Sequence, residues 1–188
     1  MSKGQKTTKK KKPRKLRIFD FDDTLVQTKG TVDLVKIDGA RVVMTPAEFA
    51  VYDKLPGERF DFTKFEETLV EPAEVKWVTK ILRRVVKKHG QDGAMVLTAR
   101  SKDAPVLRFF RMFNIPAIPV VCLNSADPQR KADHVYLLAT EDEYDVIEFF
   151  DDSLKNINAV REISQKLPHI KIIVRHIRHL RLEKIYVT

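Results

Sequence analysis

The sequence has little cysteine and no long apolar run. Cys122 is the only cysteine, so no disulfide can form within the chain, and its apolar neighbours at 118–123 predict a small buried side chain. A single thiol fits a reducing compartment, and we expect a cytoplasmic protein. No apolar run approaches the roughly 20 residues that a membrane-spanning helix requires. The basic N-terminus also lacks the apolar stretch of a secretory signal, so no membrane association is expected.

Acidic residues are absent from the first 17 positions, which hold nine basic side chains. The whole chain has 35 Lys and Arg against 26 Asp and Glu, so the other 26 basic residues balance the acids and the net charge of +9 lies in this segment. We expect residues 1–15 to form a disordered basic tail and residues 16–188 one folded domain. Such a tail binds nucleic acid or another polyanion, acts as a nuclear import signal, or only keeps the chain soluble.

Short apolar runs alternate with amphipathic stretches along the rest of the chain, and no internal repeat is visible. The runs at 16–21, 94–97, 118–123, 146–150 and 170–174 predict strands. The stretches at 72–89, 104–113, 128–138 and 153–166 predict helices. This alternation predicts a three-layer α/β/α, Rossmann-like fold with a central five-stranded parallel sheet. Four aromatic side chains are expected to pack in its core: Trp77, Phe109, Phe110 and Phe113.

The segment 27–71 interrupts this pattern and is interpreted as a flap with a small cap insert. Residues 31–44 alternate in polarity around Asp38-Gly39, which predicts a β-hairpin. Thr45-Pro46-Ala47-Glu48 has the pattern of a capping box with proline at the first helical position, so a short helix should begin there. Because the segment is too short for a full cap domain, a fairly open site is expected.

Polar side chains collect where three predicted strands end. Carboxyl ends of parallel strands share one edge of a sheet, where ligands bind. Several carboxylates at that edge would repel one another unless a cation lay among them, and oxygen ligands favour Mg²⁺. The three strand ends carry Asp20-Phe21-Asp22-Asp23-Thr24, Thr98-Ala99-Arg100 and Asp151-Asp152-Ser153.

These residues carry a family resemblance. Phe19-Asp20-Phe21-Asp22-Asp23-Thr24-Leu25 resembles the first motif of the haloacid-dehalogenase (HAD) superfamily, and Leu97-Thr98 resembles its second. Lys131 fits the third motif, a lysine near the start of a helix, and Phe149-Phe150-Asp151-Asp152 resembles the fourth. The resemblance spans residues 16 to about 175, and four motifs in order are a more specific signal than any one of them.

The resemblance implies a role for each matching residue. Asp20 would be the nucleophile, and Asp22 would protonate the leaving group and then activate water. Asp20, the Asp22 carbonyl and Asp152 would hold Mg²⁺, with Asp151 assisting. Thr98 and Lys131 would bind the phosphoryl oxygens. Thr24 would orient the loop of Asp22.

Several residues keep a second interpretation. Arg130 and Lys155 are alternatives to Lys131, and Arg100 either touches a substrate phosphate or pairs with an acid. Structural roles are expected for four more residues: Asp23 as a turn cap, Ser153 as a helix cap, and His176 and His179 as surface side chains.

The leading functional hypothesis is a Mg²⁺-dependent phosphomonoesterase that acts on nucleic-acid ends or nucleotides. The alternatives are a phosphoprotein phosphatase and a non-catalytic nucleic-acid-binding protein with the same fold. A narrower resemblance concerns 45–49, 56–58 and 60–62, which look like an insert in small HAD-like proteins of large tailed phages.

Overall fold

The structure, a computed structural model, describes residues 13–63, 69–141 and 144–178. Most of the predicted basic tail, residues 1–12, lies outside the described residues, as does His179. Across these three ranges, no helix combines the length and the apolar character needed to span a membrane.

A five-stranded parallel sheet forms the centre of the molecule. Its strand order is β10-β9-β1-β7-β8, and each neighbouring pair is parallel. The predicted fold class is confirmed, with strand bounds within a few residues of those expected. The strands are β1 (Lys15–Phe19), β7 (Ala94–Thr98), β8 (Val120–Cys122), β9 (Val146–Asp151) and β10 (Lys171–His176).

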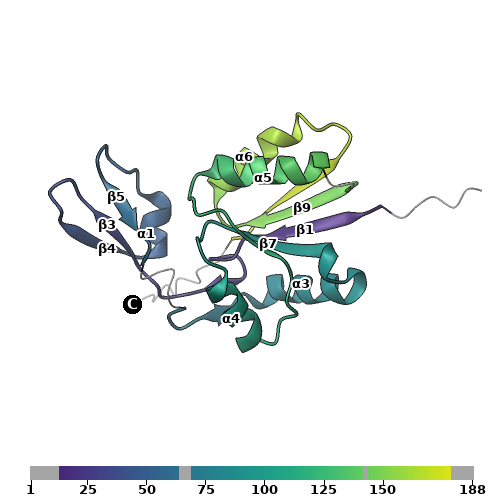
Figure 1. The fold of residues 1–188 in the computed structure, drawn as a ribbon, viewed down its shortest axis with the longest axis horizontal. Coiled ribbons are helices and arrows are strands. Elements are labelled where there is room, and N and C mark those ends of the chain that lie inside the picture. The colour runs from purple at the N-terminus through teal and green to yellow at the C-terminus, as the bar shows by residue number, and fades with distance from the viewer. Residues whose placement is uncertain (1–12, 64–68, 142–143, 179–188) are drawn as a thin grey trace, which may run out of the picture.

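Helices cover both faces of this sheet (Figure 1). On one face lie α3 (Lys76–His89) and α4 (Ala104–Met112), and on the other lie α5 (Pro128–Glu141) and α6 (Leu154–Ser164). A short 3₁₀ turn, η1 (Gln91–Gly93), joins α3 to β7. The apolar side chains of each strand therefore meet a helix on both sides, which a parallel sheet requires.

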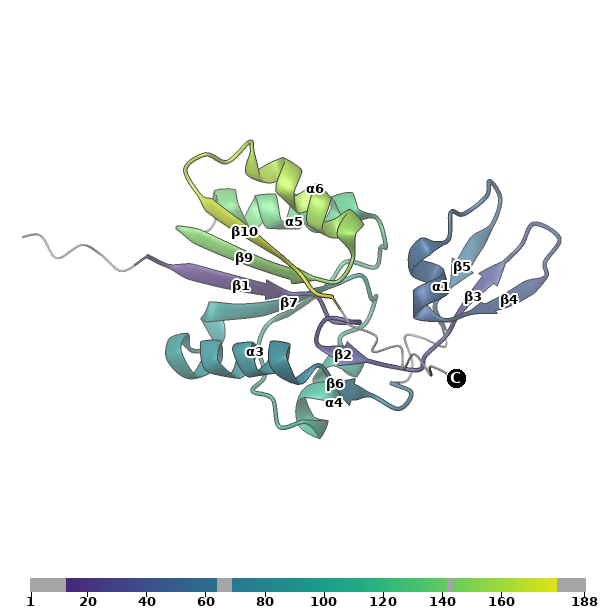
Figure 2. The same ribbon diagram turned by 180° about the vertical axis from the view of Figure 1, so that it is seen from behind.

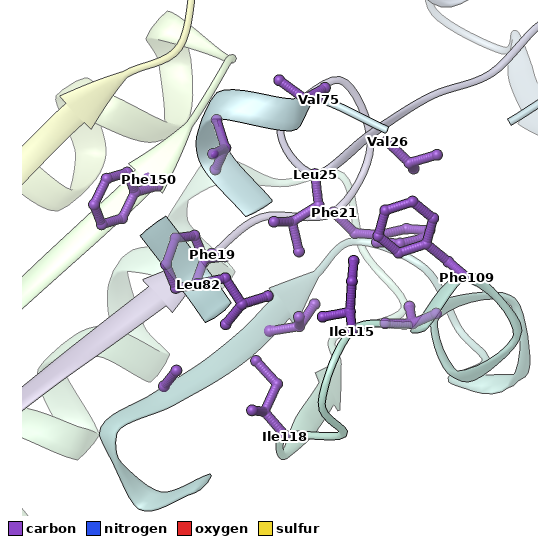
Figure 3. Close-up of a cluster of buried hydrophobic side chains, with 14 of the residues drawn as sticks. Phe19, Phe21, Leu25, Val26, Val75, Leu82, Phe109, Ile115, Ile118 and Phe150 are labelled. Carbon is purple, nitrogen blue, oxygen red and sulfur yellow. The ribbon is translucent and has the colours of Figure 1, made fainter. Parts of the chain in front are cut away.

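The core on the α3 and α4 side is rich in phenylalanine (Figure 3). Phe19 of β1 stacks on Phe150 of β9 with ring centroids 4.7 Å apart. Phe21, just beyond β1, meets the edge of Phe109 on α4 at 5.4 Å. The predicted core positions of Phe109 and Phe110 are confirmed, and Phe113 packs partly buried against the same cluster.

The prediction for Trp77 is wrong, because its side chain is 51% exposed. Val78 and Leu82 turn toward the sheet instead. Successive helical residues differ by about 100° around the helix axis, so Trp77, the residue before Val78, points away from the sheet. Cys122 is only partly buried, since β8 lies at the edge of the sheet.

The insert folds as a separate small layer. Its antiparallel sheet has the order β4-β3-β5. The short helix α1 lies between β4 and β5 in the chain. The predicted hairpin is confirmed, with Gly39 at a φ of 85° in its turn. The capping box at Thr45 is also confirmed. The elements are β3 (Val32–Val35), β4 (Arg41–Met44), α1 (Pro46–Val51) and β5 (Arg59–Asp61).

A two-stranded neck connects the insert to the main domain (Figure 2). It consists of β2 (Val26–Gln27) and β6 (Ala73–Glu74), which pair antiparallel. The predicted helix at 72–89 therefore begins only at Lys76, because Ala73 and Glu74 form a strand. The Val75 N–H also donates to the Leu25 carbonyl at 3.0 Å, which ties the neck to the turn after β1.

Leu82→Ala tests the packing of α3 on the sheet. Leu82 is fully buried, so truncation should lower the free energy of unfolding by about 2–5 kcal/mol. Lys80→Ala, an exposed change on the same helix, should stay within about 0.5 kcal/mol of the parent. Urea denaturation of both variants measures the difference, and equal stabilities would contradict this packing.

Candidate active site

Asp20 lies at the carboxyl end of the central strand β1. Its N–H donates to the Phe150 carbonyl at 2.9 Å, so the backbone pairing with β9 continues through Asp20. The chain then turns sharply, because the N–H groups of Leu25 and Val26 both donate to the Phe21 carbonyl. Asp23 occupies the left-handed region with φ 54°, which aspartate tolerates better than most residues. Asp23 thus has the turn position expected of it.

Asp151 and Asp152 end the neighbouring strand β9. The Asp151 carboxylate accepts from the Ser153 N–H at 2.9 Å, and both of its oxygens accept from Asn156 Nδ2, at 3.0 and 3.1 Å. The Ser153 side chain caps α6, as predicted. His176 Nε2 lies 2.9 Å from the Asp152 carbonyl oxygen, which gives this histidine a contact in the loop rather than a free surface position.

Lys131 lies between the two strand ends. It sits in the first turn of α5, and its Nζ donates to Asp20 Oδ1 at 2.6 Å and to Asp151 Oδ2 at 2.8 Å. Burial by itself lowers the pKa of Lys131, but the two carboxylates outweigh this effect and raise the pKa. The alternatives, Arg130 and Lys155, are exposed. Lys131 is therefore the lysine that reaches the acids.

Asp20, Asp151 and Asp152 form an acidic cluster with carboxylate oxygens within 4.8 Å of one another. Burial, followed by repulsion from Asp20 and Asp151, raises the pKa of Asp152 to about 8. Burial also raises the pKa of Asp151, to about 6. If all three carboxylates were ionised, the single ammonium of Lys131 would leave two negative charges unbalanced, and the raised pKa values reflect this crowding. A divalent cation with a preference for oxygen ligands fits this charge and this donor set.

Thr24 contacts this cluster rather than Asp22. Its Oγ1 donates to Asp152 Oδ1 at 3.4 Å, and its side chain is fully buried. Thr24 was predicted to orient the loop of Asp22. It also makes a direct contact with Asp152 at the end of β9.

Asp22 pairs with Arg100. The guanidinium donates from Nε to Asp22 Oδ2 at 2.8 Å and from Nη2 to Oδ1 at 2.7 Å. The Arg100 side chain is 2% exposed and that of Asp22 is 25% exposed, so the guanidinium is shielded from water while the carboxylate faces the cavity. Burial raises the pKa of Asp22, and the guanidinium offsets part of that rise. The sequence left two roles open for Arg100, contact with a substrate phosphate or pairing with an acid. The structure shows the pairing with an acid.

Thr98 adjoins the site without lining its cavity. Its side chain is fully buried at the end of β7, where Oγ1 accepts from the Arg100 N–H at 3.2 Å. Thr98 therefore supports the backbone that carries Arg100. Its predicted role as a phosphate ligand stays a prediction.

A cavity of about 380 Å³ lies between the acidic edge of the sheet and the insert. Figure 2 shows the insert beyond the carboxyl ends of β1 and β9. One side of the cavity is charged and polar, with Asp20, Asp22, Lys131 and Asp152, while the other consists of aromatic rings from the insert. The insert thus covers one side of the site, which was expected to be fairly open. Its aromatic lining residues are Phe49, Tyr52, Phe60 and Phe62.

Sequence reasoning missed three parts of this arrangement. Asn156 lies in the first turn of α6 and contacts Asp151, five residues earlier and outside the helix, so no helical spacing indicated the contact. Arg100 follows β7 by two residues, which gave its location but not its partner. For the aromatic lining, the sequence held one indication: Phe60 and Phe62 are two residues apart, so in an extended segment both point to the same side. Comparisons with family models, with curated proteins and with solved structures find no match to this chain, so function is inferred from these side chains.

Proposed function

We propose that this chain is a Mg²⁺-dependent phosphomonoester hydrolase of the HAD type, with Asp20 as the nucleophile. The acidic cluster carries the proposal. Two buried carboxylates, one partly buried carboxylate and one buried lysine meet at the ends of the adjacent strands β1 and β9, beside a cavity of substrate size. Buried like charges are costly, so their assembly at this edge favours a functional site over a structural one.

Mg²⁺ fits the cluster and would be held by Asp20, Asp152 and the Asp22 carbonyl, with Asp151 assisting through its own contacts. When bound, the ion supplies the positive charge that lets a phosphate dianion approach the carboxylates. Lys131 supplies further positive charge and bridges Asp20 and Asp151.

The chemistry needs two carboxylates with different roles. An Asp20 oxygen attacks phosphorus, and the ester P–O bond breaks with its electrons on the departing oxygen, which takes a proton from Asp22. Asp22 then accepts a proton from water, whose oxygen attacks phosphorus and breaks the bond to Asp20, so that orthophosphate leaves. The raised pKa of Asp22 supports its role as the acid. Arg100 holds the Asp22 carboxylate and is proposed as a positioning residue.

Removal of the metal tests the proposed function. Hydrolysis of p-nitrophenyl phosphate should be lost in EDTA and restored by Mg²⁺, whereas Ca²⁺ should restore little, because it prefers longer bonds and more ligands. Asp152→Asn should raise the Mg²⁺ concentration needed for half-maximal activity by about tenfold or more. Asp133→Asn, the same change at an exposed acid outside the cavity, is the control.

Full activity in EDTA would overturn the metal site. An unchanged Mg²⁺ requirement in Asp152→Asn would remove this residue from the ligands. A panel of nucleotides, 5′-phosphorylated oligonucleotides and phosphopeptides, assayed with Mg²⁺, separates the leading hypothesis from a phosphoprotein phosphatase.

A further inference from the structure

We infer that the insert provides a leaving-group subsite for a planar aromatic ring, so that the preferred substrates are phosphomonoesters of the nucleotide type. The subsite is the aromatic wall, defined as Phe49, Tyr52, Phe60 and Phe62. This inference rests on the proposed function, because it assigns the far side of the same cavity. It covers a free mononucleotide and the terminal nucleotide of a strand, which share this chemistry.

The four rings of the aromatic wall form one continuous surface. Phe49 meets Phe60 at 4.8 Å and Phe62 at 5.4 Å, with interplanar angles of 83° and 89°. Tyr52 extends the surface through Phe60, at 6.2 Å and 79°. Edge-to-face packing of this kind leaves ring faces and edges available to a further ring. The wall therefore offers stacking positions rather than a flat aliphatic surface.

The rings are held in place by the segment between α1 and β5. The Tyr52 hydroxyl donates to Glu58 Oε2 at 2.9 Å, and the same oxygen accepts from the Leu55 N–H at 2.9 Å. Glu58 is buried, so this contact anchors the ring from behind. Since its hydroxyl is engaged there, Tyr52 presents mainly its ring to the cavity. A preorganised wall loses little side-chain entropy when a ligand binds.

Packing within the insert does not by itself account for these rings. The insert already buries other apolar side chains almost completely, including Val32, Leu34 and Met44. The wall rings stay partly exposed, and all four line the cavity that contains Asp20 and Lys131. Partly exposed aromatic groups gathered opposite charged groups are typical of a ligand site, in which a few polar groups fix orientation.

The remaining residues that line the cavity suit a sugar, the group that links the phosphate to the ring in a nucleotide. Asn124, Ser125 and Lys155 lie on the main-domain side of the cavity with the acids. These groups can bind sugar hydroxyls, whereas the wall can stack a base. A volume of about 380 Å³ falls in the range of small-molecule pockets. The cavity thus has room for one nucleotide.

The test compares two substrates that differ by the ring. The parent protein should hydrolyse adenosine 5′-monophosphate with a kcat/KM at least about tenfold above that for ribose 5-phosphate. Phe62→Leu and Phe49→Leu keep an apolar side chain but remove a ring, and each should lower kcat/KM for the nucleotide by about tenfold. Hydrolysis of ribose 5-phosphate should change by less than about twofold. Tyr136→Leu, an exposed aromatic residue outside the cavity, is the control.

Equal losses on both substrates would assign the wall a purely structural role and overturn the inference, as would no loss on either. A 5′-phosphorylated dinucleotide included in the same assay shows whether a strand end is accepted as well as a free nucleotide. If neither substrate is hydrolysed by the parent protein with Mg²⁺, the proposed function fails. Calorimetric binding to Asp20→Asn then tests the subsite alone: tighter binding of the nucleotide, lost in the added Phe62→Leu change, supports it, and equal binding overturns it.

Discussion

Asp20→Asn is expected to lower kcat for p-nitrophenyl phosphate by at least about a thousandfold, because the amide cannot attack phosphorus. The fold should survive. The asparagine Oδ1 can still accept the hydrogen bond from Lys131 Nζ, and the main-chain bond from the Asp20 N–H to Phe150 is unaffected. The change also removes one of three crowded negative charges, so in EDTA the melting temperature should match or exceed that of the parent.

The matched control is Asp23→Asn, which makes the same chemical change three residues later. Asparagine tolerates the left-handed conformation of this turn, so kcat should stay within a few fold of the parent. Acid quenching during turnover of a ³²P-labelled substrate should trap label on the parent protein and none on Asp20→Asn. Near-normal turnover in Asp20→Asn, or label retained on it, would exclude covalent catalysis through this residue.

Lys131→Met should have the largest effect on stability. The substitution keeps an unbranched side chain, one atom shorter, but leaves Asp20 and Asp151 without their shared ammonium, and both carboxylates are buried. Removing one partner from a buried charge pair costs about 3–5 kcal/mol. Urea denaturation in EDTA measures this loss. Hydrolysis should fall as well, because the cluster then lacks its fixed positive charge.

Mg²⁺ makes this prediction more specific. If the ion binds the cluster, it should recover part of the lost stability, so the difference between variant and parent should shrink as Mg²⁺ rises. Lys155→Met is the control: its ammonium lies at the same cavity but is largely exposed, and its contact to Asp53 is 3.9 Å long. A variant as stable as the parent in EDTA would mean that Lys131 does not balance the cluster.

The strand ends could be predicted from the sequence because their signal is local. Asp20 and Asp151 each follow an apolar run, and parallel pairing brings such ends to one edge of the sheet. Lys131 could be placed because it resembles the third motif of the HAD superfamily, a lysine near the start of a helix that precedes β9. The acidic cluster and its lysine were therefore predicted together, although the bonds from Lys131 to two acids were not.

Other parts of the site depend on geometry that no local pattern records. The pairing of Arg100 with Asp22 follows from the conformations of two turns that are 78 residues apart in the chain. The aromatic wall faces the acids because the neck directs the insert over the strand ends, and the length of the insert says nothing about that direction. The exposure of Trp77 likewise depends on the rotation of α3 about its axis, which directs Val78 and Leu82 toward the sheet instead.

The neck has a consequence for how such a protein can diversify. Val26 pairs with Glu74 and Gln27 with Ala73, so the chain departs and returns at adjacent points. Any segment that can span this pair, from a two-residue turn to a whole domain, leaves the path of the main domain unchanged. Lengthening costs little, because each doubling of a flexible loop adds only about 0.6 kcal/mol of closure entropy. The insert and the main domain are thus separable pieces of one chain, and under the proposed function the part that selects the substrate can be exchanged while the acidic cluster is kept.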